Sequence, residues 1–168
     1  MEKQAQLNFV MQQGFPEASA SECGSKYSSL MWQPRVTAVL VAVGLVFQLW
    51  PLFLALSAVL WWNVSLPRLN LFDAIYNRFV ASPKSLAKLT PAPAPRRFAQ
   101  GMAASFMLGI GTTLLLGWSM AAYVLEALLV VALSALILTK FCLGSYIYLL
   151  LTGQARFANR TLPWARPQ

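Results

Sequence analysis

The chain has 168 residues, of which 58% are hydrophobic and 11% are charged, and its net charge is +8. This composition excludes an ordinary soluble globular domain, in which about 25% of residues are charged. Histidine is absent, which excludes histidine-ligated haem, histidine-containing zinc sites and Ser-His or Cys-His nucleophiles within this chain. We expect one domain integral to a membrane, with no metal, no cofactor and no enzymatic activity.

Residues 1–32 form a polar N-terminal segment of mixed charge, which we expect on the cytoplasmic side. Because no apolar run follows a basic start, we expect no cleaved signal peptide. The two cysteines, Cys23 and Cys142, form no CxxC motif. They fit a reduced compartment and predict no disulfide framework.

The first apolar block, residues 36–66, contains no charged side chain. As a single helix it would be about 46 Å long and would cross a membrane once with a strong tilt. The Trp50-Pro51 pair offers a turn instead, with Pro51 in the first turn of a new helix. We predict two helices, over residues 34–49 and 51–66.

A short helix is predicted over residues 71–81, with Asn70 as its N-cap and Asp73 in its first turn. Its apolar stripe consists of Phe72, Ile75, Tyr76, Phe79 and Val80. This helix either lies in the membrane interface or packs on the end of the protein's own bundle. The "TPAPAP" segment then forms a stiff connector.

The second apolar block, residues 98–139, contains Glu126 as its only charged residue. A single helix of this length would be about 63 Å long, twice the hydrocarbon core of about 30 Å, so the block must fold back. Gly117 suits a turn and Trp118 suits a membrane interface. We predict helices over residues 98–116 and 119–141.

The basic residues flank the two blocks, and none lies in either predicted turn. If both blocks are hairpins, all 13 basic residues fall on one side, as the positive-inside rule favours. A single crossing of the first block would place Arg35 and the basic linker on opposite faces. This charge pattern indicates contact with membrane lipid and not with nucleic acid.

The predicted fold is an all-α membrane protein with four transmembrane helices arranged as two helical hairpins, and a short interfacial helix between them. The transmembrane domain covers residues 33–151, and a basic cytoplasmic tail covers residues 152–168. We expect the inner (plasma) membrane of a bacterium, with both termini cytoplasmic. The predicted membrane-interface anchors are Trp50, Trp118, Arg96, Arg97 and Trp164.

Glu126 is a candidate functional residue, because an ionised carboxyl group inside a membrane is costly. The residue is either a neutral acid hydrogen-bonded between helices, a proton- or substrate-coupled site, or a contact with a partner subunit. The hydrogen-bonding side chains considered for it are Thr112, Thr113, Ser134 and Tyr123.

Gly101, Ser105 and Gly109 recur at a spacing of four residues. Small residues at this spacing let helices approach closely. We interpret them as packing positions within the bundle, with self-association as the second interpretation.

Cys142 lies beside Lys140, which we expect at the cytoplasmic end of the fourth helix. A nearby lysine favours the reactive thiolate. Cysteine also occurs in apolar surroundings as a small inert residue, so both interpretations remain open.

The segments "QPRV", "ASPKSLAKL", "PAPRRFAQGM" and "FCLGSYIYLLL" resemble the bacterial integral-membrane family known as domain of unknown function 4395, over about residues 33–151. The resemblance implies a second cysteine in the last motif, as FCxGC, where this chain has Ser145 followed by Tyr146. Members joined to thiol or sulfur-transfer domains imply redox or sulfur handling. Without the second cysteine, Cys142 is expected to be structural.

We therefore expect a non-catalytic accessory or scaffold subunit that forms a homo-oligomer or joins a larger membrane complex. One alternative is a thiol-linked sulfur or redox component that uses Cys142. Another is a small proton-coupled transporter that uses Glu126, although the one-sided charge disfavours a transporter inserted in both orientations.

Overall fold

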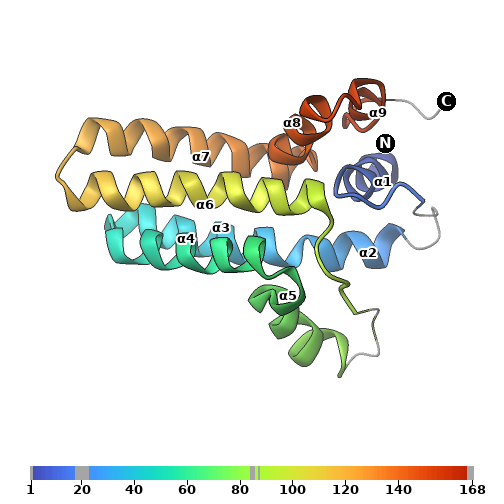
Figure 1. Ribbon diagram of the computed structural model, residues 1–168, viewed down its shortest axis with the longest axis horizontal. Helices are drawn as coiled ribbons and strands as arrows, with labels where there is room; N and C mark the ends of the chain where they lie inside the picture. Colours follow the sequence, from blue (N-terminus) through green and yellow to red (C-terminus); the bar gives the residue numbers. More distant parts are fainter. Residues whose placement is uncertain (1, 18–22, 84–85, 87, 166–168) are drawn as a thin grey trace.

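The computed structural model describes residues 2–17, 23–83, 86 and 88–165, and the regular structure within these residues is entirely helical. Four long helices form the body of the protein in Figure 1. They are α3 (Trp32–Phe47), α4 (Trp50–Ser65), α6 (Ala94–Leu115) and α7 (Ser119–Thr139). The shorter elements are α1 (Glu2–Gln12), α2 (Cys23–Leu30), α5 (Leu71–Tyr76), α8 (Leu143–Leu151) and α9 (Ala155–Arg160), with a 3₁₀ turn at Pro67–Leu69 and a π-helical turn at Asn77–Ala81.

The long helices pair as two hairpins whose turns lie at the same end of the bundle (Figure 1). We call this end the turn end. The first turn uses Gln48, whose φ of 48° is left-handed, and Pro51 follows in the first turn of α4. The second turn uses Gly117, with a φ of 73°, a conformation that glycine adopts without steric cost.

Three stretches among the described residues are long and apolar enough to cross a membrane: Cys23–Phe47, Ala94–Leu115 and Ser119–Thr139. The fourth apolar helix, Trp50–Ser65, has 16 residues. Its length of about 24 Å is shorter than a hydrocarbon core of about 30 Å. The structure therefore has three candidate spans and one shorter apolar helix beside them.

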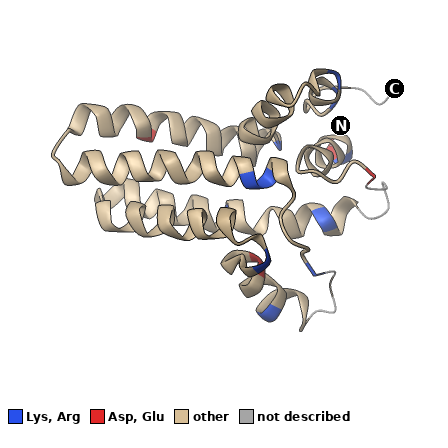
Figure 2. Cartoon of the chain, viewed as in Figure 1, with Lys and Arg blue, Asp and Glu red and all other residues tan. Residues whose placement is uncertain are grey.

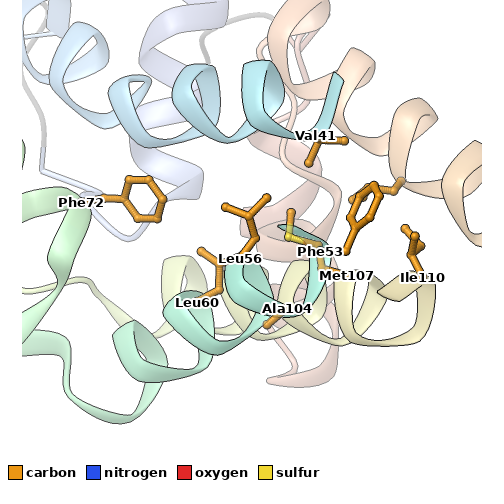
Figure 3. Packing of buried hydrophobic residues seen from close by; sticks show 9 residues of the cluster. Val41, Phe53, Leu56, Leu60, Phe72, Ala104, Met107 and Ile110 are labelled. Atoms are coloured by element: carbon orange, nitrogen blue, oxygen red, sulfur yellow. The ribbon is translucent and has the colours of Figure 1, made fainter. Parts of the chain in front are cut away.

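The main hydrophobic core lies between the two hairpins, where α4 packs along α6 (Figure 3). Its buried residues are Val41, Phe53, Leu56, Leu60, Phe72, Ala104, Met107, Ile110 and Leu129. The two backbones approach closely at Gly111, where an added Cβ would lie 2.7 Å from Cδ2 of Leu54 and 3.1 Å from the Trp50 carbonyl oxygen. The Ser57 hydroxyl also donates to the Ala104 carbonyl at 2.8 Å.

The N-terminal segment contains α1 and α2, which the sequence analysis did not predict as helices. They form a second apolar cluster at the other end of the bundle, made of Phe9, Val10, Cys23, Tyr27, Leu30, Met31 and Cys142. Asn8 donates to the Leu162 carbonyl at 2.8 Å, which ties α1 to the segment after α9. The polar N-terminal segment thus folds into helices that cover this end of the bundle.

The chain after α7 is also more structured than predicted. The predicted helix over 119–141 ends at Thr139, because Lys140 adopts a left-handed φ of 59°. A separate helix, α8, then begins after Cys142, whose backbone is extended. Gly144 at its start touches α6, where an added Cβ would lie 2.8 Å from Cα of Ala99.

The predicted N-cap of α5 is confirmed, because the Asn70 side chain accepts a hydrogen bond from the Asp73 backbone N–H at 3.1 Å. Phe72 and Tyr76 are buried against the bundle. Ile75 and Phe79 are exposed on the outside of the same segment. Packing on the bundle's own end is therefore shown, and membrane contact of the outer side chains stays a prediction.

Candidate functional site

Apart from Glu126 in α7, the described charged residues gather at the end of the bundle opposite the two turns (Figure 2). We call it the basic end. The described lysines and arginines there are Lys3, Lys26, Arg35, Arg68, Arg78, Lys88, Arg96, Arg97, Lys140, Arg156 and Arg160. The candidate site lies at this end of the bundle and is covered by α1.

Arg96, at the start of α6, forms a buried ion pair with Asp73 of α5. Its Nη2 lies 2.6 Å from Asp73 Oδ1, and its Nη1 donates to Asp73 Oδ2 at 3.1 Å. This fork-to-carboxylate geometry is the strongest form of such a pair. Arg96 is only 4% exposed, so its side chain is enclosed by the protein, and its role as a membrane-interface anchor stays a prediction. Neighbouring Arg97 donates to the Val64 carbonyl near the end of α4, at 2.9 Å from Nη2.

Two glutamines extend this ion pair into the bundle. Gln33 Oε1 accepts from Arg96 Nη2 at 3.0 Å and from Gln100 Nε2 at 2.7 Å. An arginine can only donate, so Gln33 must present its oxygen, and Gln100 must present its amide nitrogen. The oxygen of Gln100 is left buried without a hydrogen-bond partner. Sequence reasoning assigned no role to Gln33, although this residue is the first of the "QPRV" segment.

A cavity of about 280 Å³ lies beside this network, between α3, α6, α7 and the start of α8. Its walls are mostly apolar. The lining includes Pro34, Thr37, Leu60, Ala99, Met102, Ala103, Phe106, Leu128, Leu129, Val131, Ala132, Leu133, Leu136, Leu143 and Gly144. Its polar lining residues are Gln13, Gln33, Thr37, Arg96 and Gln100, and Cys142 also contacts it.

Cys142 is buried, with 7% exposure, at the N-terminus of α8. Its backbone N–H donates to Gln12 Oε1 at 2.8 Å, so α1 holds the start of α8. Ser145 is fully buried, accepts from Gln13 Nε2 at 3.1 Å and donates to the Pro95 carbonyl at 3.3 Å. Cys23 lies in the same apolar cluster as Cys142, which the sequence did not indicate, and both thiols are free.

Lys140 is bound to groups of the N-terminal cover. Its Nζ lies 3.0 Å from Glu2 Oε1 and 5.9 Å from the centre of the Tyr27 ring. The hydrogen bond and charge of Lys140 lower the pKa of the Glu2 carboxyl below its ordinary value of 4.5. The ammonium group that was considered as an activator of Cys142 therefore already has an acidic partner.

Glu126 is buried in α7, with 7% exposure, and its Oε2 accepts from Gln48 Nε2 at 3.4 Å. Its other oxygen, Oε1, is buried without a hydrogen-bond partner. Thr113, considered above as a donor, instead donates to the carbonyls of Gly109 and Ile110. The donor that the structure shows, Gln48, is the one amide residue near the first turn, and sequence reasoning missed it.

The small residues of α6 have separate environments. An added Cβ at Gly109 would lie 3.0 Å from Leu125 of α7, and one at Gly101 would lie 3.8 Å from Val64 of α4. Ser105 is exposed and its hydroxyl donates to the Gly101 carbonyl within the same helix. Gly101 and Gly109 thus face other helices of the bundle, whereas Ser105 faces outward.

The aromatic anchors are on the surface. Trp50, Trp118 and Trp164 are 41%, 63% and 74% exposed, with the first two at the turn end and Trp164 after α9. Their contact with a membrane interface stays a prediction. Within the described part of the chain, no three His, Cys, Asp or Glu side chains are grouped as metal ligands would be.

A search of curated proteins found no match to the chain. A search of solved structures found none either. Residues 30–152 match the model of the family described as Domain of unknown function (DUF4395), and the chain therefore belongs to this family.

Proposed function

We propose that the protein crosses a bacterial inner membrane four times, with both termini in the cytoplasm. Two features support this topology. The two hairpins turn at the same end, and the basic residues lie at the opposite end (Figure 2). Basic residues on one side are the usual signature of cytoplasmic loops. The short helix α4 fits a membrane through local thinning or through snorkelling of flanking side chains.

Its role in this proposal is that of a non-catalytic accessory or scaffold subunit, packed against itself or a larger membrane complex. The observation that carries this role is the surface of α7. Only Ala122, Glu126 and Leu129 are buried among the residues of this helix. Met120, Tyr123, Val124, Leu128 and Val131 are all more than half exposed, with Met120 reaching 78%. Such a helix offers a long apolar face for a neighbouring helix.

The polar groups at the basic end support a structural role. Arg96 is held by Asp73, Lys140 by Glu2, and Ser145 by Gln13 and the Pro95 carbonyl. These bonds connect different elements of the fold. A catalytic group needs access to a substrate, whereas these groups use their hydrogen-bonding capacity within the protein.

The test is photo-crosslinking in native membranes, with the crosslinker at Val124 of α7 and, as a control, at Val39 of α3. Both side chains are exposed, at 58% and 64%. The proposal predicts a discrete protein adduct from position 124 and lipid adducts only from position 39. Identical lipid adducts from both positions would remove the support for a partner on α7.

A second candidate function is a thiol-linked sulfur or redox component. One observation favours it: Cys142 contacts the cavity, and Cys23 lies in the same apolar cluster. The burial of both thiols weighs against it, because reactive cysteines are usually accessible. Labelling rates of Cys142 separate the two candidates, as set out in the Discussion.

A further inference from the structure

Residues 66–83, which we call the α5 segment, project from the side of the bundle near the basic end (Figure 1). The segment contains the 3₁₀ turn, α5 and the π-helical turn. It begins where α4 ends, and the connector after it leads into the candidate span Ala94–Leu115. In the proposed topology, the α5 segment therefore lies where the bundle leaves the hydrocarbon on the cytoplasmic side.

Hydrogen bonds fix the α5 segment on both sides of its helix. The Leu71 backbone N–H donates to Asn63 Oδ1 of α4 at 2.9 Å. Asn77 Nδ2 donates to the Leu89 carbonyl at 3.1 Å, and Asn77 Oδ1 accepts from the Leu89 backbone N–H at 2.8 Å. The inner side chain Phe72 is part of the main hydrophobic core. The outer side chains of the segment are therefore held away from the bundle by a fixed backbone.

The outward face of the α5 segment is apolar. Its large exposed side chains are Leu69, Leu71, Ile75 and Phe79, with exposed fractions of 61%, 47%, 40% and 72%. Three of them recur at a spacing of four residues and share one face of the helix. Large apolar side chains that gather on a surface in this way mark an interaction site.

The charges on the α5 segment have one sign. Arg68 and Arg78 are exposed, and neither forms a salt bridge within the part of the chain that the structure describes. Asp73 is the only acidic residue in residues 23–125, and it is buried in its pair with Arg96. The outward face thus combines cations with apolar side chains, and the one carboxylate of the segment is already bound.

We propose that the α5 segment is a docking surface for anionic phospholipids of the cytoplasmic leaflet. This assignment rests on the topology proposed above. Phe79 and Leu69 enter the boundary between headgroups and acyl chains, and Arg68 and Arg78 bind lipid phosphate. Amphipathic helices at interfaces use this combination of apolar burial and attraction to anionic lipid. A soluble acidic protein would match the charges, but a lipid offers hydrocarbon and phosphate together.

The first test locates Phe79 relative to the bilayer. A nitroxide is attached at Phe79→Cys, in a chain with Cys23→Ser and Cys142→Ala, in nanodiscs of phosphatidylglycerol and phosphatidylcholine. The control is Ala155→Cys, an exposed position on α9 outside the candidate spans. We expect more collisions with oxygen, and fewer with a water-soluble nickel complex, at position 79. Equal accessibility of the two positions to the nickel complex would leave this face for a protein partner and overturn the proposal.

The second test measures the preference for anionic headgroups by native mass spectrometry of the full chain in mild detergent. The probes are phosphatidylglycerol and phosphatidylcholine with identical acyl chains. Arg68→Gln with Arg78→Gln should weaken phosphatidylglycerol binding about tenfold, because each basic residue near the surface attracts anionic lipid. The matched control removes two exposed charges from α9, by Arg156→Gln with Arg160→Gln, and should leave the tightest adduct unchanged.

Equal weakening in the two double variants, or equal binding of the two lipids to the parent chain, would overturn the proposal. All four substituted arginines are exposed, so both double variants should fold. The nanodiscs have the same lipids in both leaflets, and detergent has no sides. These measurements therefore do not depend on the orientation of the chain in cells, which the cysteine labelling in the Discussion tests separately.

Discussion

The turn end and the basic end of the bundle are stabilised by different interactions. At the turn end, α4 and α6 meet at Gly111 and Leu54, and α3 meets α4 where Gly44 faces the Phe53 ring. At the basic end, the Arg96–Asp73 pair and its glutamines join α3, α5 and α6. Added helices cover this end, with α1 bonded to α8 through Gln12 and Cys142.

The difference follows from the surroundings in the proposed topology, where Gly44 and Gly111 lie within candidate membrane spans and α1 and α8 lie outside them. A helix inside hydrocarbon gains no hydrophobic energy from packing on another helix, so close contact and small residues hold it. An end near water gains from apolar burial, and it tolerates charges that are paired. The basic end therefore carries most of the polar groups with specific partners, whereas the turn end relies on shape apart from the hydrogen bond from Gln48 to Glu126. The following predictions test this division.

The largest effect is expected from Asp73→Asn, which leaves the Arg96 charge buried without its carboxylate. Removing one partner of a buried pair costs about 3–5 kcal/mol. Denaturant unfolding in detergent measures the loss, with Arg68→Gln, an exposed position, as the control. The double variant Asp73→Asn with Arg96→Met should recover part of the stability. A single variant within about 1 kcal/mol of the parent would show that the pair does not hold the basic end.

At the turn end, Gly111→Ala should destabilise the protein by about 1–3 kcal/mol, because the new methyl group overlaps Leu54 and touches a backbone oxygen. Gly101→Ala is the matched control on the same helix, where the nearest atom is 3.8 Å away and the contact is ordinary. Thermal unfolding of both variants measures the difference. Equal melting temperatures would mean that close packing of α4 on α6 is not what secures this end.

Cys142→Ala tests whether the basic end holds a working thiol. Replacing a small buried side chain should cost at most about 1–2 kcal/mol and leave assembly intact. In the parent chain, Cys142 should label slowly with a thiol reagent from pH 6 to pH 9, because it is buried under α1. Cys23→Ser provides the background for this measurement. Rapid labelling, together with loss of function in the alanine variant, would favour the sulfur or redox candidate.

The smallest effect concerns the pair formed by exposed Glu2 and half-buried Lys140. Because the folded-state pKa of Glu2 lies below its ordinary value of 4.5, the pair stabilises the fold above that pH. The contribution is lost as the pH falls through the lowered pKa. Melting temperature measured from pH 6 to pH 3 should fall slightly more for the parent chain than for Glu2→Gln. Identical pH profiles would show that this pair adds nothing to the cover.

The parts that could be predicted from sequence depend on local signals. The break at Gly117 follows from the left-handed φ that glycine adopts. The Asn70 cap follows from the ability of an asparagine side chain to accept a hydrogen bond from a backbone N–H three residues later. The Arg96–Asp73 pair joins residues that are 23 positions apart, and no local pattern specifies such a partner. The helix α1 has no clear apolar face, and contacts such as Asn8 with Leu162, from the far end of the chain, hold it. Gln48 and Gln33 were missed for the same reason, since their roles depend on Glu126 and Arg96.

Cysteine-accessibility labelling in intact and permeabilised cells tests the four-crossing topology most directly. Single cysteines at Gly24, Lys88, Leu49 and Trp118, all exposed, are placed in a chain with Cys23→Ser and Cys142→Ala. The topology predicts that Gly24 and Lys88 label only after permeabilisation, and that Leu49 and Trp118 label from outside. Labelling of Gly24 and Lys88 from opposite faces would show that the first apolar block crosses once and would contradict the account.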